Sequence, residues 1–449
     1  MYKILVTGSI HKIGLEMLRK EKDIEIHFAP DLPYAEILKI ITPFHCILSR
    51  SETAIPKELI DKASKLKVIA RAAVGIGNID VNYATEKGIL IINTPGKNTN
   101  SAAELTIGLL LSAMRKMIPA HIHMSELKWD RHTFTGTELF GKTIGIIGLG
   151  NVGHRVARYA KAFDMEVLAY DPYVADEVFE RHNSKKCTWN ELLSSADVIS
   201  LHVPKNTETT GMIGAKEFSR MKSGVVILNS ARGGVIQEKP LLEELKSGKV
   251  AAAGIDTWEE EPPQENPFRD LPQVVMSPHV GASTTEAQIR IAKSIATQTP
   301  RALRGEVVEF PVNMPSVQIL GRGLVASYVS LAEKLGVFSS QYVDFIPTHL
   351  EIKYRGKLAE HDGTLLRLCF LKGLLKSRKN FVSYVNADQQ AENVGLHIEE
   401  TDDPGFTDYE SALKCTLAGA GKKFAIGGVV FSGPHPRITL INSFVCEFE

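Results

Sequence analysis

Three short motifs supply the residue types that oxidise a secondary alcohol by hydride transfer. Such a reaction needs a base for the hydroxyl proton, a cation that holds a carboxylate and polarises the forming carbonyl, and a hydride acceptor. Histidine has the pKa range of the base, and a carboxylate on its other ring nitrogen would raise that pKa. The planar fork of arginine suits a bidentate carboxylate, as lysine would not. The candidates are Arg232 in NSARGGVI, a glutamate in GIDTWEEEPP (254–263) and His279 in SPHVGAST.

A glycine fingerprint upstream of these motifs indicates where the hydride acceptor binds. The run Gly148-Leu149-Gly150-Asn151-Val152-Gly153 follows the strand-like TIGII and opens a helical pattern. In a dinucleotide-binding unit, such glycines make a tight turn, admit the pyrophosphate and let the helix pack on the sheet. A second strand-like run, EVLAY, is followed by Asp171, at the spacing where a carboxylate meets the ribose hydroxyls and would repel a 2′-phosphate. The pattern predicts NAD as cofactor rather than NADP.

The elements that must position these residues follow from alternating patterns. From residue 3 to about 310, short β-branched runs alternate with helical stretches, which predicts two doubly wound parallel sheets with ligands at the carboxyl ends of the strands. Beyond Gly305, helical stretches near 318–337, 364–376 and 383–394 accompany a strand at 348–356 and four later strands. The predicted fold class is therefore α/β, with two Rossmann-like domains and a C-terminal α+β domain.

In order and spacing, these motifs resemble the D-isomer-specific 2-hydroxyacid dehydrogenases over about residues 2–313. The resemblance selects Glu261 from the three glutamates and leaves the two before it as surface charge. It implies that Arg232, Glu261 and His279 are catalytic and that Asp256 holds the nicotinamide carboxamide. The cofactor contacts that it implies are Val74, Gly148, Gly150, Asn151, Val152, Gly153, Asp171, Val203, Ser230, Ala231, Asp256 and Gly281.

The first predicted domain carries the residues that would choose the substrate. Backbone amides of Gly75, Ile76 and Gly77 could receive its carboxylate, as a concave nest of N–H groups does. In the 3-phosphoglycerate dehydrogenases, a branch of the same family, basic residues surround the substrate phosphate. The matching positions here are Arg50, Arg71 and Arg131. The alternative is that Arg71 and Arg131 are ordinary solvated charges at strand ends.

The C-terminal segment, residues 317–449, resembles the intervening domain of the long-form enzymes of that branch. In those enzymes a serine-binding ACT domain follows, whereas this sequence stops after FVCEFE, so we expect a form without that domain. The domain boundaries that we predict are 1–97 with 286–313 for substrate binding, 98–285 for NAD and 317–449 for the intervening-like domain.

Composition limits the other possibilities. The 449 residues contain 52 Lys and Arg and 52 Asp and Glu, so no net charge attracts nucleic acid or a membrane. The five scattered cysteines show neither a disulfide framework nor zinc-ligand spacing, and we expect no metal. The opening MYKILVTGSI is too brief for a signal peptide, which favours the cytoplasm.

The resemblance implies NAD-dependent oxidation of a phosphorylated 2-hydroxy acid, D-3-phosphoglycerate, by a homodimer or homotetramer. One alternative is another D-2-hydroxyacid dehydrogenase, such as a hydroxypyruvate or glyoxylate reductase. The other is an NAD-binding corepressor, because transcriptional corepressors share this fold. The C-terminal domain and the lack of an evident interaction tail count against the corepressor.

Overall fold

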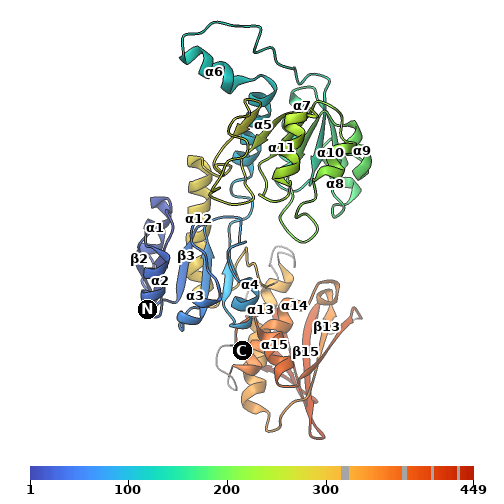
Figure 1. Ribbon diagram of the computed structural model, residues 1–449. Coiled ribbons are helices and arrows are strands. Elements are labelled where there is room, and N and C mark those ends of the chain that lie inside the picture. The colour runs from blue at the N-terminus through green and yellow to red at the C-terminus, as the bar shows by residue number, and fades with distance from the viewer. Residues whose placement is uncertain (315–322, 377–381, 406–408, 432–434, 449) are drawn as a thin grey trace. The chain divides into compact units, whose positions relative to one another are not determined.

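The computed structural model describes residues 1–314, 323–376, 382–405, 409–431 and 435–448. The chain divides into two compact units, one formed by Met1–Pro95 with Ile291–Glu449 and the other by Gly96–Arg290. Each unit is described by itself below (Figure 1). Two parallel α/β sheets and one mixed sheet confirm the predicted fold class. None of the described helices is both long and apolar enough to cross a membrane.

The unit Gly96–Arg290 is built on a seven-stranded parallel sheet in the order β12-β11-β10-β9-β6-β7-β8. The order reverses between β6 and β9, and a parallel sheet of this kind opens a ligand crevice at that point. The strands are β6 (Thr143–Ile147), β7 (Glu166–Tyr170), β8 (Lys185–Lys186), β9 (Val198–Leu201), β10 (Val225–Asn229), β11 (Val250–Ile255) and β12 (Val274–Met276).

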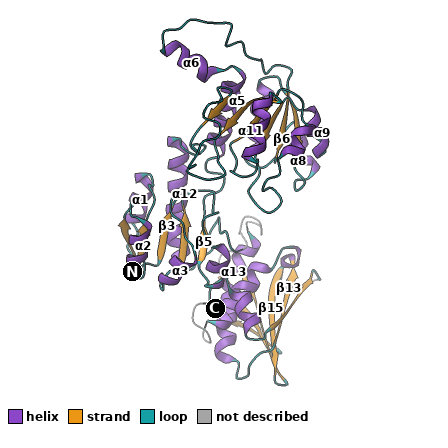
Figure 2. Cartoon of the chain, viewed as in Figure 1, coloured by secondary structure: helices purple, strands orange, loops and turns teal. Residues whose placement is uncertain are grey.

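Helices cover both faces of this sheet (Figure 2), so its central strands are buried on both sides. Helix α5 packs against β10, β11 and β12, which lets it touch the loops that follow those strands. The helices are α5 (Thr99–Met114), α6 (Met117–Ser125), α7 (Gly153–Ala162), α8 (Asp176–Arg181), α9 (Trp189–Ser195), α10 (Ala215–Arg220) and α11 (Glu238–Ser247).

The other unit begins with a five-stranded parallel sheet in the order β2-β1-β3-β4-β5. Its strands are β1 (Tyr2–Val6), β2 (Ile24–Phe28), β3 (Cys46–Ser49), β4 (Val68–Arg71) and β5 (Leu90–Ile92). Its helices are α1 (Lys12–Arg19), α2 (Tyr34–Ile40), α3 (Lys57–Lys62) and α4 (Val81–Glu86). The long helix α12 (Thr285–Leu303) contains the boundary between the two units.

The same unit ends in a six-stranded mixed sheet in the order β14-β13-β15-β16-β17-β18, with only β13 and β14 parallel among its neighbours. The burial of β15 alternates along the strand, because one face of the sheet packs on helices and the other faces solvent. The strands are β13 (His349–Gly356), β14 (His397–Asp403), β15 (Ser411–Gly419), β16 (Lys422–Phe431), β17 (His435–Ile441) and β18 (Phe444–Phe448).

The helices of this part are α13 (Leu324–Tyr342), α14 (Thr364–Leu375) and α15 (Ala387–Asn393), with the short 3-10 helix η1 (Lys357–Glu360). Among the described residues five strands follow β13, so the expectation of four was wrong. Strand β18 pairs with β17 after a tight turn. The apolar run of β18 is too short to be distinguished from that of β17 in the sequence pattern. The predicted helix start at 318 lies outside the described residues. We keep the three-domain division with boundaries at 97, 286 and 317 as a proposal.

Candidate active site

The three fingerprint glycines have three different roles in the turn from β6 to α7. Gly148 has a φ of +90°, in the left-handed region, and an added Cβ would lie 2.9 Å from the His202 carbonyl oxygen. A Cβ on Gly153 would lie 2.0 Å from the Gly148 carbonyl oxygen, so α7 packs closely on the turn. A Cβ on Gly150 would meet nothing within 4 Å, so this backbone faces open space. The turn therefore fits a dinucleotide pyrophosphate.

Asp171 follows β7 and is held by two backbone groups. Its Oδ2 accepts a hydrogen bond from the Leu149 N–H at 2.9 Å, and its Oδ1 accepts one from the Tyr173 N–H at 3.0 Å. The carboxylate is thereby fixed beside the fingerprint, where it can reach a ribose. Asn151 and Val152 lie in the same turn, and Val203 Cγ1 packs against Gly148. These positions suit the predicted cofactor contacts, which remain a prediction.

Replacing Asp171 by serine should weaken NAD binding about tenfold, because the hydrogen bonds to the ribose are lost. The ratio of the affinities for NAD and NADP should also fall, because the carboxylate that repels a 2′-phosphate is removed. Titration calorimetry with each cofactor would measure both changes. Asp176→Ser, in the exposed first turn of α8, is the matched control and should leave both affinities unchanged. Wild-type protein that binds NADP as tightly as NAD would contradict this role.

His279 and Glu261 form a hydrogen-bonded pair. The imidazole Nδ1 lies 2.6 Å from Glu261 Oε2, although 18 residues separate them in sequence. The hydrogen bond with Glu261 raises the pKa of His279, and burial opposes this effect only in part. Burial acts to raise the pKa of Glu261, but the bonds from His279 and from the Trp258 N–H outweigh it, so that pKa is lowered. With 42% of its side-chain surface exposed, His279 remains accessible to a substrate.

The backbone around His279 is strained and strongly held. His279 has a φ of +52°, a conformation that non-glycine residues rarely adopt and that needs support from its surroundings. Asp256, which is fully buried, supplies that support through three hydrogen bonds from one loop. Its Oδ1 accepts from Ser277 Oγ at 2.6 Å and from the Val280 N–H at 2.8 Å, and its Oδ2 accepts from the Gly281 N–H at 2.9 Å. Asp256 therefore orients the loop of His279, a role that sequence reasoning missed.

Arg232 lies in the turn after β10. Burial lowers the pKa of Arg232, and the charge of Glu261 opposes this effect, so the two side chains lie within electrostatic range. Asn229 shapes the turn: its Nδ2 donates to the Arg232 carbonyl oxygen at 3.0 Å, and its Oδ1 accepts from the Ala231 N–H at 3.1 Å. Ser230 Oγ lies 2.6 Å from Thr106 Oγ1 on α5. Asn229 was not among the predicted residues, although its place at the end of a buried strand is a usable signal.

The two other glutamates differ from each other. Glu259 exchanges hydrogen bonds with Glu238 at the start of α11: Glu259 Oε1 accepts from the Glu238 N–H at 2.9 Å, and the Glu259 N–H donates to Glu238 Oε1 at 2.8 Å. The expectation that it is mere surface charge was therefore incomplete. Glu260 accepts a hydrogen bond from Gln264 in an exposed turn. Neither bonds to His279, so the structure brings only Glu261 to the imidazole.

Glu261→Gln should move the acid limb of the oxidation rate to lower pH. In the oxidation direction His279 must be neutral to accept a proton, so the rate rises as pH passes its pKa. Because Glu261 raises that pKa, removing the carboxylate charge lowers it toward the ordinary value of histidine. A pH profile of kcat would measure the shift, with Glu260→Gln as the control. An unchanged profile for Glu261→Gln, or an equal shift for the control, would show that the wrong glutamate had been assigned.

The predicted substrate residues of the first sheet belong to the other unit. The loop Val74–Gly77 joins β4 to α4, and Asn93 Nδ2 donates to the Val74 carbonyl oxygen at 2.9 Å. Arg71 is the last residue of β4 and pairs in register with Ser49, the last residue of β3, and Arg50 follows Ser49 directly. These residues gather at the carboxyl edge of the sheet, as the alternation of strands and helices predicted.

Arg71 is fully buried, which excludes the solvated alternative for this residue. Its Nη2 donates to the Thr53 carbonyl oxygen at 3.1 Å and to Asn78 Oδ1 at 2.8 Å, whereas Nε and Nη1 are buried without a partner in the described part of the chain. Burial lowers the pKa of Arg71 to about 10. Arg131, by contrast, is exposed in the segment after α6 and belongs to the unit Gly96–Arg290. The structure does not place the three arginines in one unit.

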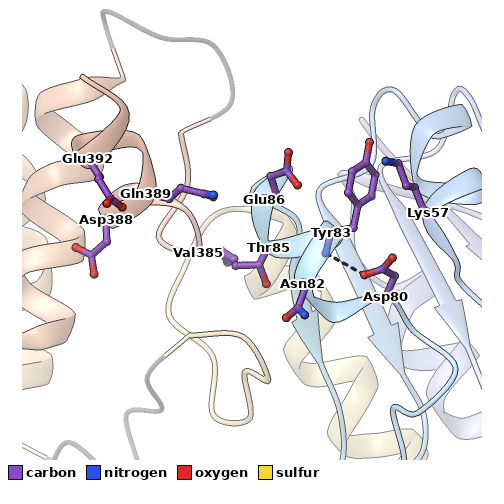
Figure 3. A pocket seen from close by; sticks show the side chains of 10 residues that line it. All are labelled: Lys57, Asp80, Asn82, Tyr83, Thr85, Glu86, Val385, Asp388, Gln389 and Glu392. Atoms are coloured by element: carbon purple, nitrogen blue, oxygen red, sulfur yellow. Dashed lines mark hydrogen bonds between the residues drawn. The ribbon is translucent and has the colours of Figure 1, made fainter. Parts of the chain in front are cut away.

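A hollow of about 810 Å³ lies elsewhere, among α3, α4 and α15 (Figure 3). Four carboxylates line it, of which Asp80 caps α4 through the Tyr83 N–H and Asp388 pairs with Arg367. It contains none of the predicted site residues, and we assign it no part in the reaction.

Hydride transfer with a bound dinucleotide is the chemistry that the Gly96–Arg290 unit supports, which puts the chain among the NAD-dependent dehydrogenases. Residues 107–281 match the model of the D-isomer specific 2-hydroxyacid dehydrogenase NAD binding domain, and residues 324–442 match that of the D-3-phosphoglycerate dehydrogenase intervening domain. The chain belongs to the D-isomer-specific 2-hydroxyacid dehydrogenase family, in the branch whose members are named D-3-phosphoglycerate dehydrogenase.

Relatives and solved structures agree with this placement. The chain is 40% identical to the D-3-phosphoglycerate dehydrogenase of Methanocaldococcus jannaschii, over 100% of its own length and 85% of that protein. It is 38% identical to the enzyme of that name from Archaeoglobus fulgidus, over 99% and 85%. A crystal structure of a glyoxylate reductase from Paecilomyes thermophila is 31% identical with a TM-score of 0.64, covering 69% of this chain and 98% of that one.

Proposed function

We propose that the chain oxidises D-3-phosphoglycerate to 3-phosphooxypyruvate with NAD, the first step of serine biosynthesis. The observation that carries the proposal is the 40% identity, along the whole chain, to a protein named D-3-phosphoglycerate dehydrogenase. The match of residues 324–442 to the intervening domain of those enzymes supports it further. Glyoxylate reductase, the second candidate, is the name of a structural neighbour that covers only 69% of the chain.

The site residues suit each requirement of the reaction. Neutral His279 takes the proton of the substrate hydroxyl, and Glu261, at 2.6 Å from the imidazole, stabilises the imidazolium that forms. Arg232 holds the carboxylate and polarises the forming carbonyl. NAD, when bound on the fingerprint turn, supplies the hydride acceptor.

The phosphate would distinguish this substrate from the smaller acids of the family. Arg50 and Arg71 lie at neighbouring strand ends, and Arg71 has two buried nitrogens without a protein partner. A buried donor without a partner is costly, and a hydrogen bond to a phosphate oxygen would satisfy it. Arg131 is proposed as a third contact, from the exposed segment after α6.

The test is turnover by the purified chain with D-3-phosphoglycerate and NAD, beside D-glycerate, which lacks only the phosphate. The proposal expects kcat/KM for the phosphorylated acid to be higher by about a hundredfold, the equivalent of roughly two charge-assisted hydrogen bonds. Assays with hydroxypyruvate or glyoxylate and NADH test the alternative reductases. Binding of NAD without turnover of any of these acids would favour a corepressor.

The assembly that we propose is a cytoplasmic homodimer or homotetramer. The segment 117–140 exposes large apolar side chains, and α6 within it packs only on α5 among the described elements with substantial contacts. Several large apolar side chains exposed on one segment favour a contact of that segment with another protein surface. The exposed side chains are Met117, Ile118, Ile122, Met124, Leu127, Trp129 and Phe140. Light scattering during size-exclusion chromatography would give the oligomer mass, and a monomer would remove this proposal.

A further inference from the structure

Trp258 lies between Asp256 and the glutamates and is only 7% exposed. Its indole ring belongs to the apolar core under the sheet, with its centroid 6.2 Å from that of Phe268. A buried indole usually finds a partner for its N–H, and that partner shows what the residue holds in place.

Trp258 contacts the segments of both members of the acid-base pair. Its backbone N–H donates to Glu261 Oε1 at 3.0 Å, which leaves Oε2 for His279 Nδ1 at 2.6 Å. Its indole Nε1 donates to the Ser277 carbonyl oxygen at 3.1 Å, two residues before His279. Trp258 thus fixes which carboxylate oxygen of Glu261 faces the imidazole. It also holds the backbone at Ser277, where the chain leads into His279.

The turn that carries Arg232, the third of the three motifs, also packs against Trp258. A Cβ on Gly233 would lie 1.5 Å from the Trp258 carbonyl oxygen, so the turn that carries Arg232 packs directly on the Trp258 backbone. Only glycine allows that approach. The three motifs therefore meet at Trp258, although none of the reacting atoms belongs to it.

We propose that Trp258 is a positioning residue that holds Glu261 and His279 in register, through its backbone N–H on one side and its indole N–H on the other. The proposal rests on the proposed hydride-transfer function of the site. The left-handed backbone of His279 makes the support necessary, since that conformation relaxes when its restraints are removed. Loosening of the segment would lengthen the bond between Glu261 and His279, and the pKa of His279 would then fall toward its ordinary value.

The first test uses the wild-type chain. It has three tryptophans, so three indole N–H signals are expected in a nitrogen-15 spectrum. Trp129→Phe and Trp189→Phe each remove one signal, which leaves that of Trp258 identified. The imidazole signal of His279 is identified as the one that is absent from the spectrum of the His279→Asn variant. In a pH titration the chemical shift of the Trp258 indole N–H should change over the same pH range in which His279 titrates. The chemical shift of the Trp189 indole N–H should not change over that range. A Trp258 signal that stays constant across that midpoint would overturn the proposal.

The second test is Trp258→Phe, which keeps a ring in the core and removes only the indole donor. The His279 midpoint should fall by about half a unit, as expected for the loss of one hydrogen bond, and kcat should fall about fivefold with KM for NAD unchanged. Phe268→Leu is the matched control: it loosens the packing of the same ring but keeps both bonds, so it should lower Tm without moving the midpoint. A folded Trp258→Phe with the wild-type midpoint, or an equal shift in Phe268→Leu, would overturn the assignment.

The NMR titrations need no substrate. If the chain failed to oxidise D-3-phosphoglycerate, the titrations would therefore still test the role of Trp258. If Trp258→Phe does not fold, the wild-type titration decides the question alone.

Discussion

His279→Ala should lower kcat for the oxidation by a hundredfold or more, the usual share of general acid-base catalysis, while the Kd for NAD stays within about twofold. The imidazole is the group that accepts the hydroxyl proton in the proposed reaction, and Glu261, which bonds to the imidazole at 2.6 Å, supports that base and is not itself the base. The glycine turn and Asp171, which would hold the pyrophosphate and the ribose, lie on other loops, after β6 and β7, so the affinity for NAD should be largely kept. Steady-state kinetics and NAD titration would measure the two quantities.

Two further variants make the His279 result specific. His279→Asn keeps a side chain that tolerates the φ of +52° at this position, so it separates the lost base from a relaxed backbone. His361→Ala, at an exposed position beyond η1, should leave kcat unchanged. A loss of less than tenfold in both His279 variants would mean that another group accepts the proton.

Arg232→Lys should lower kcat/KM for the hydroxy acid by about a hundredfold although the positive charge is kept. Lysine cannot form the two parallel hydrogen bonds of a guanidinium fork, and each such bond to a charged group contributes about 1.5–3 kcal/mol. The turn itself should persist, because Asn229 bonds to the backbone of this turn and not to the guanidinium. Kinetics with D-3-phosphoglycerate and NAD, beside a thermal unfolding curve, would separate catalysis from folding.

The control for this substitution is Arg269→Lys, at an exposed position in the loop before β12. It should leave kcat/KM unchanged. If Arg232→Lys retained more than a third of the wild-type value, a single charge would be sufficient and the bidentate role of Arg232 would be wrong.

Local patterns predicted the strands that carry function better than the edge strands. Strands such as β6 and β10 are apolar on both faces, because helices cover both faces of a parallel sheet. Their continuous apolar runs can therefore be recognised in the sequence. Strands β2, β5 and β8 were not among the strand-like runs that the sequence showed, and β8 has only two residues. Of β2 only Ile24 is buried, since β2 lies at the sheet edge, and β5 has only three residues. Short or half-exposed strands carry too few apolar residues to show a period.

The sequence by itself determined which residues are candidates: the glycine turn, the carboxylate after β7, and an arginine, a glutamate and a histidine in order. Local chemistry favours these choices, because glycine adopts the backbone of a tight turn at little cost and histidine has the pKa range of the base. Which glutamate meets the imidazole was chosen by resemblance, and the 2.6 Å bond between Glu261 and His279 is a property of the tertiary structure. Only that structure revealed the contacts of Asp256 and Trp258 with the loop of His279, and the burial of Arg71. The contacts of Asp256 and Trp258 join the loop after β11 to the loop after β12, about 20 residues apart in sequence. Which loops meet depends on how the sheet brings its strand ends together, and no local pattern encodes that.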